Sequence, residues 1–493
     1  MEKKIKVHEK FLYEIWKKQN FIKTLNTEEG QQIEIIDTGV QNNELGGPDF
    51  MGARIKIGNL TYHGDVEIDT YHSDWKAHGH YLNKKYNSVI LHATLNNESR
   101  HHFVYTQEGR KVQTISLDAF LDEDIRKHVH NAILSERKNR MSTMPCFEIN
   151  ALVSEKEKLD FICELGIDRF KGKCNKALER LKEITYLNEL SLKEPVVKYE
   201  LDENFYSRNF TYDDFNKPVL WEQLIFESIF EALGYSKNRE IMQKLARSIN
   251  FQLFKKIENK EDFTLIIESM LFNVGGLMPD IHNLPDEETS DYIKKLTEHW
   301  SEYKLLYDGE FYNSSQWHFF KLRPQNFPTI RLAGGARLVY RIINAHIIDN
   351  MIILFEKFYD LKRIIKELRN FLIVRGDGFW KKHFVFDKIS KIEIKYFIGL
   401  SRADEIIVNV ILPILSVYFD IFDKKPCSEK VKKVYMIYLQ QSENHLVDEV
   451  TEVLALNDAW KRSVFYQGMI ELFRNYCSRE KCLECKIGAK IFG

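Results

Sequence analysis

The chain has 493 residues, of which 44% are hydrophobic and 13% aromatic, so it has ample material for packed cores and is not globally disordered. Its 71 Lys and Arg residues are balanced by 72 Asp and Glu residues, which excludes a chain-wide basic surface of the kind that grips nucleic acid. At roughly 150 residues per domain, the length predicts about two to four domains.

The sequence shows no feature of a secreted or membrane protein. Its N-terminal stretch is charged and then amphipathic, without the apolar core of a secretory signal. The longest apolar runs, 342–355 and 406–419, are interrupted by polar residues and are shorter than the ~20 residues that a membrane span needs. Seven scattered cysteines do not suggest a disulfide framework. We therefore expect a cytoplasmic protein that does not contact a membrane.

The first 145 residues have the pattern of an α+β domain. Residues 7–25 have the apolar spacing of an amphipathic helix, after which the period changes to that of β-strands separated by Gly, Pro and Asn turns. The expected strands are 33–37, 53–57, 61–69, 88–95, 102–106 and 111–117. One short helix is expected near residues 80–86, between two of these strands.

Residues 146–493 have mostly helical periodicity and predict a large, mainly α-helical domain. The expected helices are 154–190, 218–234, 262–273, 287–307, 329–346, 349–370, 401–420, 428–441, 445–457 and 461–477. Thr329 resembles a helix N-cap, and Ser401 with Asp404 resembles a capping box. Some β structure is expected to return near residues 383–396.

The densest group of ionisable residues follows one predicted strand of the first domain. Alternate residues of a strand share a face, so Val66 and Ile68 are expected on one face and the polar side chains on the other. The polar residues of that second face are His63, Asp65, Glu67 and Asp69. Carboxylates about 7 Å apart repel one another unless water or a cation intervenes. The sequence therefore predicts either a solvated polar face or a site for a hard cation such as Mg²⁺ or Mn²⁺.

A further carboxylate, Asp49, follows a Gly-Gly-Pro turn directly before the next predicted strand. With Glu67 on the adjoining strand, this looks like the arrangement of PD-(D/E)XK nucleases, a restriction-endonuclease-like fold. In those enzymes an Asp and a Glu bind the metal that activates water, and a Lys two residues after the Glu assists. Here Asp69 occupies the position of that Lys, so a nearby His or Lys would have to substitute.

Histidines are concentrated next to this strand. His78 and His80 form an H-x-H pair in the following segment and are candidate metal ligands or proton-transfer groups, since imidazole serves both roles. Satisfied, purely structural histidines are the alternative, and His92 is assigned to the core. Between residues 70 and 111, six Lys and Arg residues stand against three Asp and Glu residues, interleaved with aromatic residues. This segment predicts either a local nucleic-acid contact or an ordinary solvated surface.

The end of the chain carries three cysteines, Cys477, Cys482 and Cys485, in a C-x4-C-x2-C pattern. Three thiolates within nine residues can ligate one ion or cluster, and a Zn²⁺ ion or a [4Fe–4S] cluster requires a fourth ligand. Cys146, at the boundary between the two predicted domains, is the candidate. The alternative is that these are unligated thiols, and the residue types do not decide between zinc and iron–sulfur.

Taken together, the motifs resemble an uncharacterised bacterial family, the domain of unknown function numbered two-eight-five-one. The motifs that carry the resemblance are ELGGPDF (44–50), GDVEI (64–68), SDW (73–75), HGH (78–80), YN and VILH (86–92), RPQNFPTIRLA (323–333), Asn409, Pro413, and the three tail cysteines with Ile487 and Gly488. The resemblance implies no activity. It implies His where this chain has Asp69, which makes Asp49 and Glu67 the stronger catalytic candidates.

The leading functional hypothesis is therefore a metal-dependent phosphodiesterase of the nuclease type. Asp49 and Glu67 would hold Mg²⁺ or Mn²⁺, with Asp69 as a further candidate ligand or Asp65 assisting in its place, and His78 or His80 would move protons. The alternative is a non-catalytic adaptor that binds protein or nucleic acid and carries a structural metal at its cysteines. The sequence predicts neither the substrate nor the oligomeric state.

Overall fold

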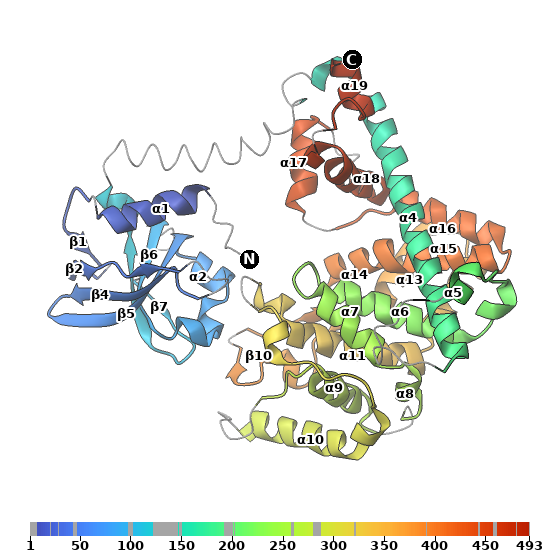
Figure 1. The fold of residues 1–493 in the computed structure, drawn as a ribbon, viewed down its shortest axis with the longest axis horizontal. Coiled ribbons are helices and arrows are strands. Elements are labelled where there is room, and N and C mark those ends of the chain that lie inside the picture. The colour runs from blue at the N-terminus through green and yellow to red at the C-terminus, as the bar shows by residue number, and fades with distance from the viewer. Residues whose placement is uncertain are drawn as a thin grey trace. The chain divides into compact units, whose positions relative to one another are not determined.

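The computed structural model divides the chain into two compact units, Met1–Thr143 with Phe319–Pro324, and Met144–His318 with Gln325–Gly493 (Figure 1). The described residues are 7–19, 21–27, 29–42, 47–96, 102–121, 146, 150–191, 201, 203–257, 261–279, 287–319, 322–390, 392–441, 444–456, 461–479 and 481–492. The motif residues Glu44, Leu45 and Gly46 lie outside the described residues, as do Glu98 and Arg100 of the basic segment.

The first unit is built on one mixed sheet with the strand order β1-β2-β4-β5-β6-β8-β7, and β3 pairs with β4. Its strands are β1 (Leu25–Asn26), β2 (Gln32–Asp37), β3 (Val40–Gln41), β4 (Phe50–Ile57), β5 (Leu60–Tyr71), β6 (Val89–Asn96), β7 (Phe103–Tyr105) and β8 (Lys111–Ser116). Neighbours β2, β4 and β5 are antiparallel, whereas β5, β6 and β8 run parallel. The α+β character expected for this part of the chain is confirmed.

Because β5 and β6 are parallel, the chain must cross over between them. The crossover contains the short helix α2 (Asp74–Ala77) and two 3-10 turns, η1 (His80–Leu82) and η2 (Lys84–Tyr86), in place of the single helix expected near 80–86. A further 3-10 turn, η3 (Leu117–Phe120), follows β8. The crossover therefore consists of tight turns, and these hold its side chains over one face of the sheet.

The two faces of the sheet have different partners. Helix α1 (Val7–Lys18) packs Trp16 into a core that also contains Val66 and Ile68 of β5. The alternation expected along β5 is thus confirmed. Glu67 and Asp69 are nevertheless buried, with exposed fractions of 4% and 6%. The alternative of a solvated acidic face is wrong, because the crossover covers these carboxylates.

The second unit is mainly helical, as expected. Its α-helices are α4 (Glu155–Glu189), α5 (Glu203–Ser207), α6 (Pro218–Leu233), α7 (Arg239–Ser248), α8 (Gln252–Lys255), α9 (Phe263–Val274), α10 (Glu287–Tyr303), α11 (Pro328–Asn344), α12 (Ile347–Lys357), α13 (Leu361–Leu372), α14 (Leu400–Ile406), α15 (Leu412–Ile421), α16 (Lys425–Ile437), α17 (His445–Val453), α18 (Ser463–Asn475) and α19 (Lys486–Phe492). A π-helical turn, Ile407–Ile411, joins α14 to α15. The strands are β9 (Val374–Arg375), β10 (His383–Val385), β11 (Lys388–Ile389) and β12 (Tyr396–Ile398), close to the β structure expected at 383–396.

Two expected helix caps are wrong. Helix α11 begins at Pro328, and the hydroxyl of Thr329 donates instead to the carbonyl of Phe384 at 2.5 Å. Helix α14 has Gly399 as its N-cap, and Asp404 is fully buried in an ion pair. In the described part of the chain, no single helix is long and apolar enough to cross a bilayer; α11 and α12 reach that length and apolarity only as a pair bent by 65°.

Helices α4 and α18 pack at close range through glycines. A Cβ atom on Gly166 of α4 would lie 2.0 Å from the carbonyl oxygen of Val464, and one on Gly468 of α18 would lie 1.9 Å from that of Ile162. Backbone atoms cannot yield as flexible side-chain ends do, so even one methyl group forces these helices apart.

We therefore expect Gly166→Ala to lower the free energy of unfolding by about 1–3 kcal/mol, through overpacking of this contact. Gly172 lies on the same helix with nothing within 4 Å of its would-be Cβ, so Gly172→Ala should stabilise the protein by about 0.4–1 kcal/mol. Urea denaturation of both variants measures the difference. Equal effects of the two substitutions would contradict the close α4–α18 packing.

Candidate metal centre

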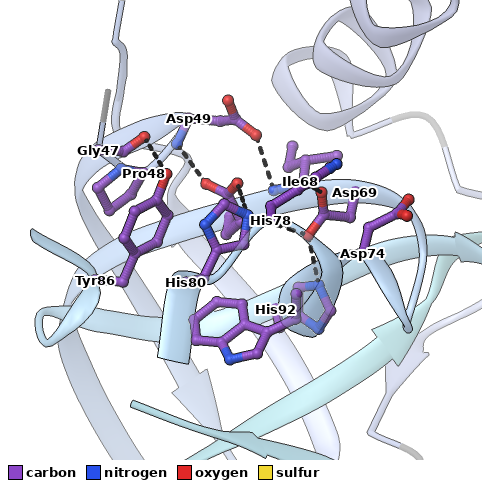
Figure 2. A network of polar contacts seen from close by, with 12 residues as sticks. Gly47, Pro48, Asp49, Ile68, Asp69, Asp74, His78, His80, Tyr86 and His92 are labelled. Atoms are coloured by element: carbon purple, nitrogen blue, oxygen red, sulfur yellow. Dashed lines mark hydrogen bonds and ion pairs between the residues drawn. The ribbon is translucent and has the colours of Figure 1, made fainter. Parts of the chain in front are cut away.

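The carboxylates predicted on β4 and β5 meet in the structure (Figure 2). The backbone N–H of Asp49 donates to Glu67 Oε2 at 3.1 Å, and the N–H of Ile68 donates to Asp49 Oδ2 at 3.0 Å. The antiparallel register that pairs Phe50 with Val66 creates this proximity, because it sets the start of β4 beside the middle of β5. Asp49 and Glu67 therefore come together as the strand pattern suggested.

The crossover after β5 brings two histidines onto these acids. His78 Nδ1 lies 3.2 Å from Asp69 Oδ1, and His80 Nε2 lies 3.0 Å from Glu67 Oε1 and 3.7 Å from Asp69 Oδ2. Gly79 between them has a φ of +75°, a left-handed conformation that a residue with a Cβ adopts only with strain. This glycine lets the chain turn sharply enough for both neighbouring imidazoles to face the carboxylates.

His92 is a third imidazole partner, which the sequence analysis assigned to the core. It is fully buried, yet its Nε2 lies 3.1 Å from Asp69 Oδ2. The parallel register of β5 and β6 places His92 opposite Glu67, next to Asp69. The length of the segment between the two strands could have suggested that they are parallel. A parallel pairing would have placed His92 beside Asp69.

Aromatic side chains hold the imidazoles in place. The ring centroid of Trp75 lies 5.3 Å from that of His80 and 5.1 Å from that of His92, while the Trp75 indole N–H donates to the carbonyl of Tyr105 at 3.0 Å. The Tyr86 ring lies 4.1 Å from His80, and its hydroxyl donates to the carbonyl of Gly47 at 3.1 Å. Rings packed in this way leave the histidines little rotational freedom, so the group of ligand atoms is preorganised.

The electrostatics of the cluster favour an ionised Asp69. Burial raises the pKa of Asp69, but the hydrogen bonds of His78 and His92 and the charge of His80 outweigh burial and hold this pKa well below its usual range. Burial, together with the charges of Glu67, Asp49 and Asp69, raises the pKa of the Tyr86 phenol far above its usual value. The tyrosine is therefore neutral and adds no negative charge to the cluster.

The geometry fits a single bound cation. In the described residues, Asp69, His78 and His80 offer one ligand atom each, all within 4.8 Å of one another. Two ligands that share a metal at about 2.1 Å and a right angle lie about 3 Å apart. His78 Nδ1 lies 3.2 Å from Asp69 Oδ1, and His80 Nε2 lies 3.7 Å from Asp69 Oδ2. Two imidazoles and a carboxylate suit Mn²⁺, Fe²⁺ or Zn²⁺ better than Mg²⁺, which prefers an all-oxygen shell.

Other residues named from the sequence have different roles. Asp49 accepts from the Tyr13 hydroxyl at 2.5 Å and from the Ile68 N–H, so both of its oxygens are engaged by protein donors. Asp65 accepts from the Gly52 N–H at 2.9 Å and from the Ser88 hydroxyl, which ties β5 to β4 and to the start of β6. Tyr13 was not foreseen, since nothing in its helix pattern distinguishes a core tyrosine from a carboxylate partner.

The chain was compared with curated proteins, with solved structures and with models of protein families. Searches of the curated proteins and of the solved structures gave no significant match. A family model matches residues 9–192 and 215–445, ranges that contain every residue of the candidate metal centre and Cys146 but end before the three tail cysteines. With most of its length matched, the chain belongs to the family described as "Protein of unknown function (DUF2851)".

Proposed function

We propose that the first unit is a metal-dependent phosphodiesterase that acts on nucleic acid. The observation that carries the proposal is that ligand atoms of Asp69, His78 and His80 lie within 4.8 Å of one another, with Glu67 Oε1 3.0 Å from His80 Nε2. Of the two cations expected from the sequence, these nitrogen donors favour Mn²⁺ over Mg²⁺. Such a cation supplies Lewis-acid stabilisation of phosphate charge and an activated water.

The strand topology supports the PD-(D/E)XK resemblance. Strands β2, β4 and β5 form an antiparallel meander, and a crossover then leads to β6, parallel to β5. Asp49 directly precedes the second of these strands and Glu67 lies within the third, so an Asp and a Glu come from adjoining strands as in such nucleases. Asp69 departs from that pattern by replacing the Lys, and the crossover histidines supply the nitrogen donors.

The histidines differ in their access to solvent. The side chain of His78 is 32% exposed, whereas that of His80 is fully buried. Substrate therefore approaches at His78, which is placed to exchange protons with water, while His80 stays fixed between Glu67 and Asp69. The exposed residues Lys76, Lys84 and Lys85 on the same crossover provide positive charge for a phosphate backbone.

The test is hydrolysis of single- and double-stranded DNA and of RNA by the full chain with added Mn²⁺. We expect cleavage that Glu67→Gln reduces at least about 100-fold, because the substitution removes the carboxylate that orients His80. Glu34→Gln, at an exposed acid of β2, is the matched control and should leave cleavage unchanged. Equal cleavage by the wild type and Glu67→Gln would dismiss the proposal.

One observation favours the alternative, a non-catalytic adaptor. Protein donors engage both oxygens of Asp49, and histidines surround Asp69, so the cluster is also a self-sufficient polar network that can fix the crossover to the sheet. The adaptor predicts that Mn²⁺ does not raise the melting temperature of the protein. A metal-binding enzyme predicts that it does, because a ligand that binds only the folded state stabilises that state.

A further inference from the structure

All seven cysteines lie in the second unit and are free thiols, and four of them belong to segments next to helix α19. Cys477 begins the 3-10 turn η13 (Cys477–Arg479) after α18, and Cys485 directly precedes α19. Helix α19 contacts α4, and Figure 1 shows it at one end of that long helix. Cys146 stands just before η4 (Asn150–Leu152), a turn that also contacts α19.

The tail folds tightly around its cysteines. The N–H of Cys485 donates to the carbonyls of Lys481 and Cys482, both at 3.2 Å. A Cβ on Gly488 would lie 2.2 Å from the carbonyl oxygen of Cys482, so only glycine permits α19 to approach this turn. The backbone around Cys482 and Cys485 is thus a compact, hydrogen-bonded turn against the start of α19.

The segment that carries Cys146 is anchored to the same region. Asn150 donates its side-chain N–H to the carbonyl of Val453 at 2.8 Å and accepts from the buried ammonium of Lys158 at 2.7 Å. Turn η4 follows Cys146 and contacts α19, which begins directly after Cys485, so the two cysteine-bearing segments meet at α19.

We propose that Cys146, Cys477, Cys482 and Cys485 ligate a single soft-metal centre, either a Zn²⁺ ion or an iron–sulfur cluster. Four thiolates complete the donor set of either guest, and clustered thiolates need a cation to offset their repulsion. The centre joins two segments more than 300 residues apart in sequence, so it fastens the tail to the start of α4. It is independent of the proposed phosphodiesterase, which uses oxygen and nitrogen donors in the other unit.

The two guests differ in the sulfur separation they require. A zinc tetrahedron with bonds of about 2.3 Å sets its sulfurs about 3.8 Å apart, whereas a [4Fe–4S] cluster places one iron at each thiolate and spans a wider separation. In the described residues, the three tail sulfurs do not all lie within the 4.8 Å that the ligand atoms of Asp69, His78 and His80 satisfy. Binding of zinc would therefore require the thiols to move closer together, whereas a [4Fe–4S] cluster would span a wider separation between them.

The experiment is elemental and sulfide analysis of the full chain purified without oxygen, with its absorption spectrum. A brown protein with absorption near ~400 nm, iron and acid-labile sulfide identifies the cluster; a colourless protein with about one zinc per chain identifies the ion. Both results support a four-thiolate centre. A protein that contains neither metal overturns it, and prompt reaction of the partly exposed Cys477 and Cys482 with a thiol reagent in the native state would show these thiols to be unligated.

Single substitutions then test which thiols take part. Cys146→Ser and Cys482→Ser should each lower metal affinity at least about tenfold, measured by competition with a chelator. Cys427→Ser is the matched control, because Cys427 is partly buried but its thiol faces the carbonyl of Phe355. Unchanged metal affinity in Cys146→Ser would exclude Cys146 as the fourth ligand. The wild-type metal and thiol analysis decides the proposal even if a variant fails to fold.

Discussion

Replacing Asp69 with asparagine is expected to weaken Mn²⁺ binding by the first unit severely. Asp69 touches three imidazoles and belongs to the group whose ligand atoms lie within 4.8 Å, so it is the carboxylate that a shared cation would contact. Asparagine keeps the shape of the side chain but removes its negative charge. Even the loss of a residue that only supports a metal ligand lowers metal affinity about 10–100-fold. We expect at least about 100-fold weaker binding, measured from the signal of free Mn²⁺ in electron paramagnetic resonance.

The control for this prediction is Glu34→Gln, which removes an equal charge from the same sheet at an exposed position. That variant should bind Mn²⁺ like the wild type, because the charge it removes lies on a different strand from the site. Circular dichroism of the metal-free proteins checks that Asp69→Asn still folds. If folded Asp69→Asn binds Mn²⁺ as tightly as the wild type, then the cluster is a structural polar network and the adaptor becomes the better hypothesis.

The pattern of apolar residues predicted most of the helices but not the ways in which they are interrupted. Helices α4, α6 and α9 begin and end within one residue of the expected ranges, because each carries a long apolar stripe and a readable start. The region 349–370 is instead two helices, α12 and α13, and 401–420 contains a π-helical turn. The break between α12 and α13 has no Gly or Pro, so the sequence pattern does not signal it. The π-helical turn directly precedes Leu412-Pro413, and Pro413 has no N–H to donate to the carbonyl of Asn409 in that turn, so this interruption does have a local signal.

The sequence predicted the part of the candidate site that depends on strands adjacent in the chain. A β-hairpin brings Asp49 and Glu67 together, and that pairing is local in sequence. The contact of His92 with Asp69 depends on the parallel register of β5 and β6, which no alternation pattern specifies. The apolar surroundings of His92 gave it the features of a core residue. Burial is therefore compatible with a role at the site, because the site itself is buried.

Asp404 shows how a polar residue that matches a local motif can serve a distant partner. Its carboxylate accepts from Arg369 Nε at 2.7 Å and Nη2 at 3.0 Å, from the Tyr438 hydroxyl at 2.5 Å and from the N–H of Gln441 at 2.8 Å. Four donors saturate one fully buried carboxylate and join three segments of the helical unit. A sequence motif for a capping box does not reveal these partners, since none lies within the same helix.

We expect Asp404→Ala to lower the free energy of unfolding of the helical unit by about 3–5 kcal/mol. The substitution leaves the Arg369 guanidinium, whose side chain is only 22% exposed, without its counter-charge and leaves the Tyr438 hydroxyl without its acceptor. Asp168→Ala is the matched control, because Asp168 pairs with Lys171 at the surface, where such a pair is worth at most about 1 kcal/mol. Chemical denaturation of the two variants compares them directly. A loss below about 1 kcal/mol in Asp404→Ala would mean that water replaces the missing carboxylate and that this ion pair does not hold the segments together.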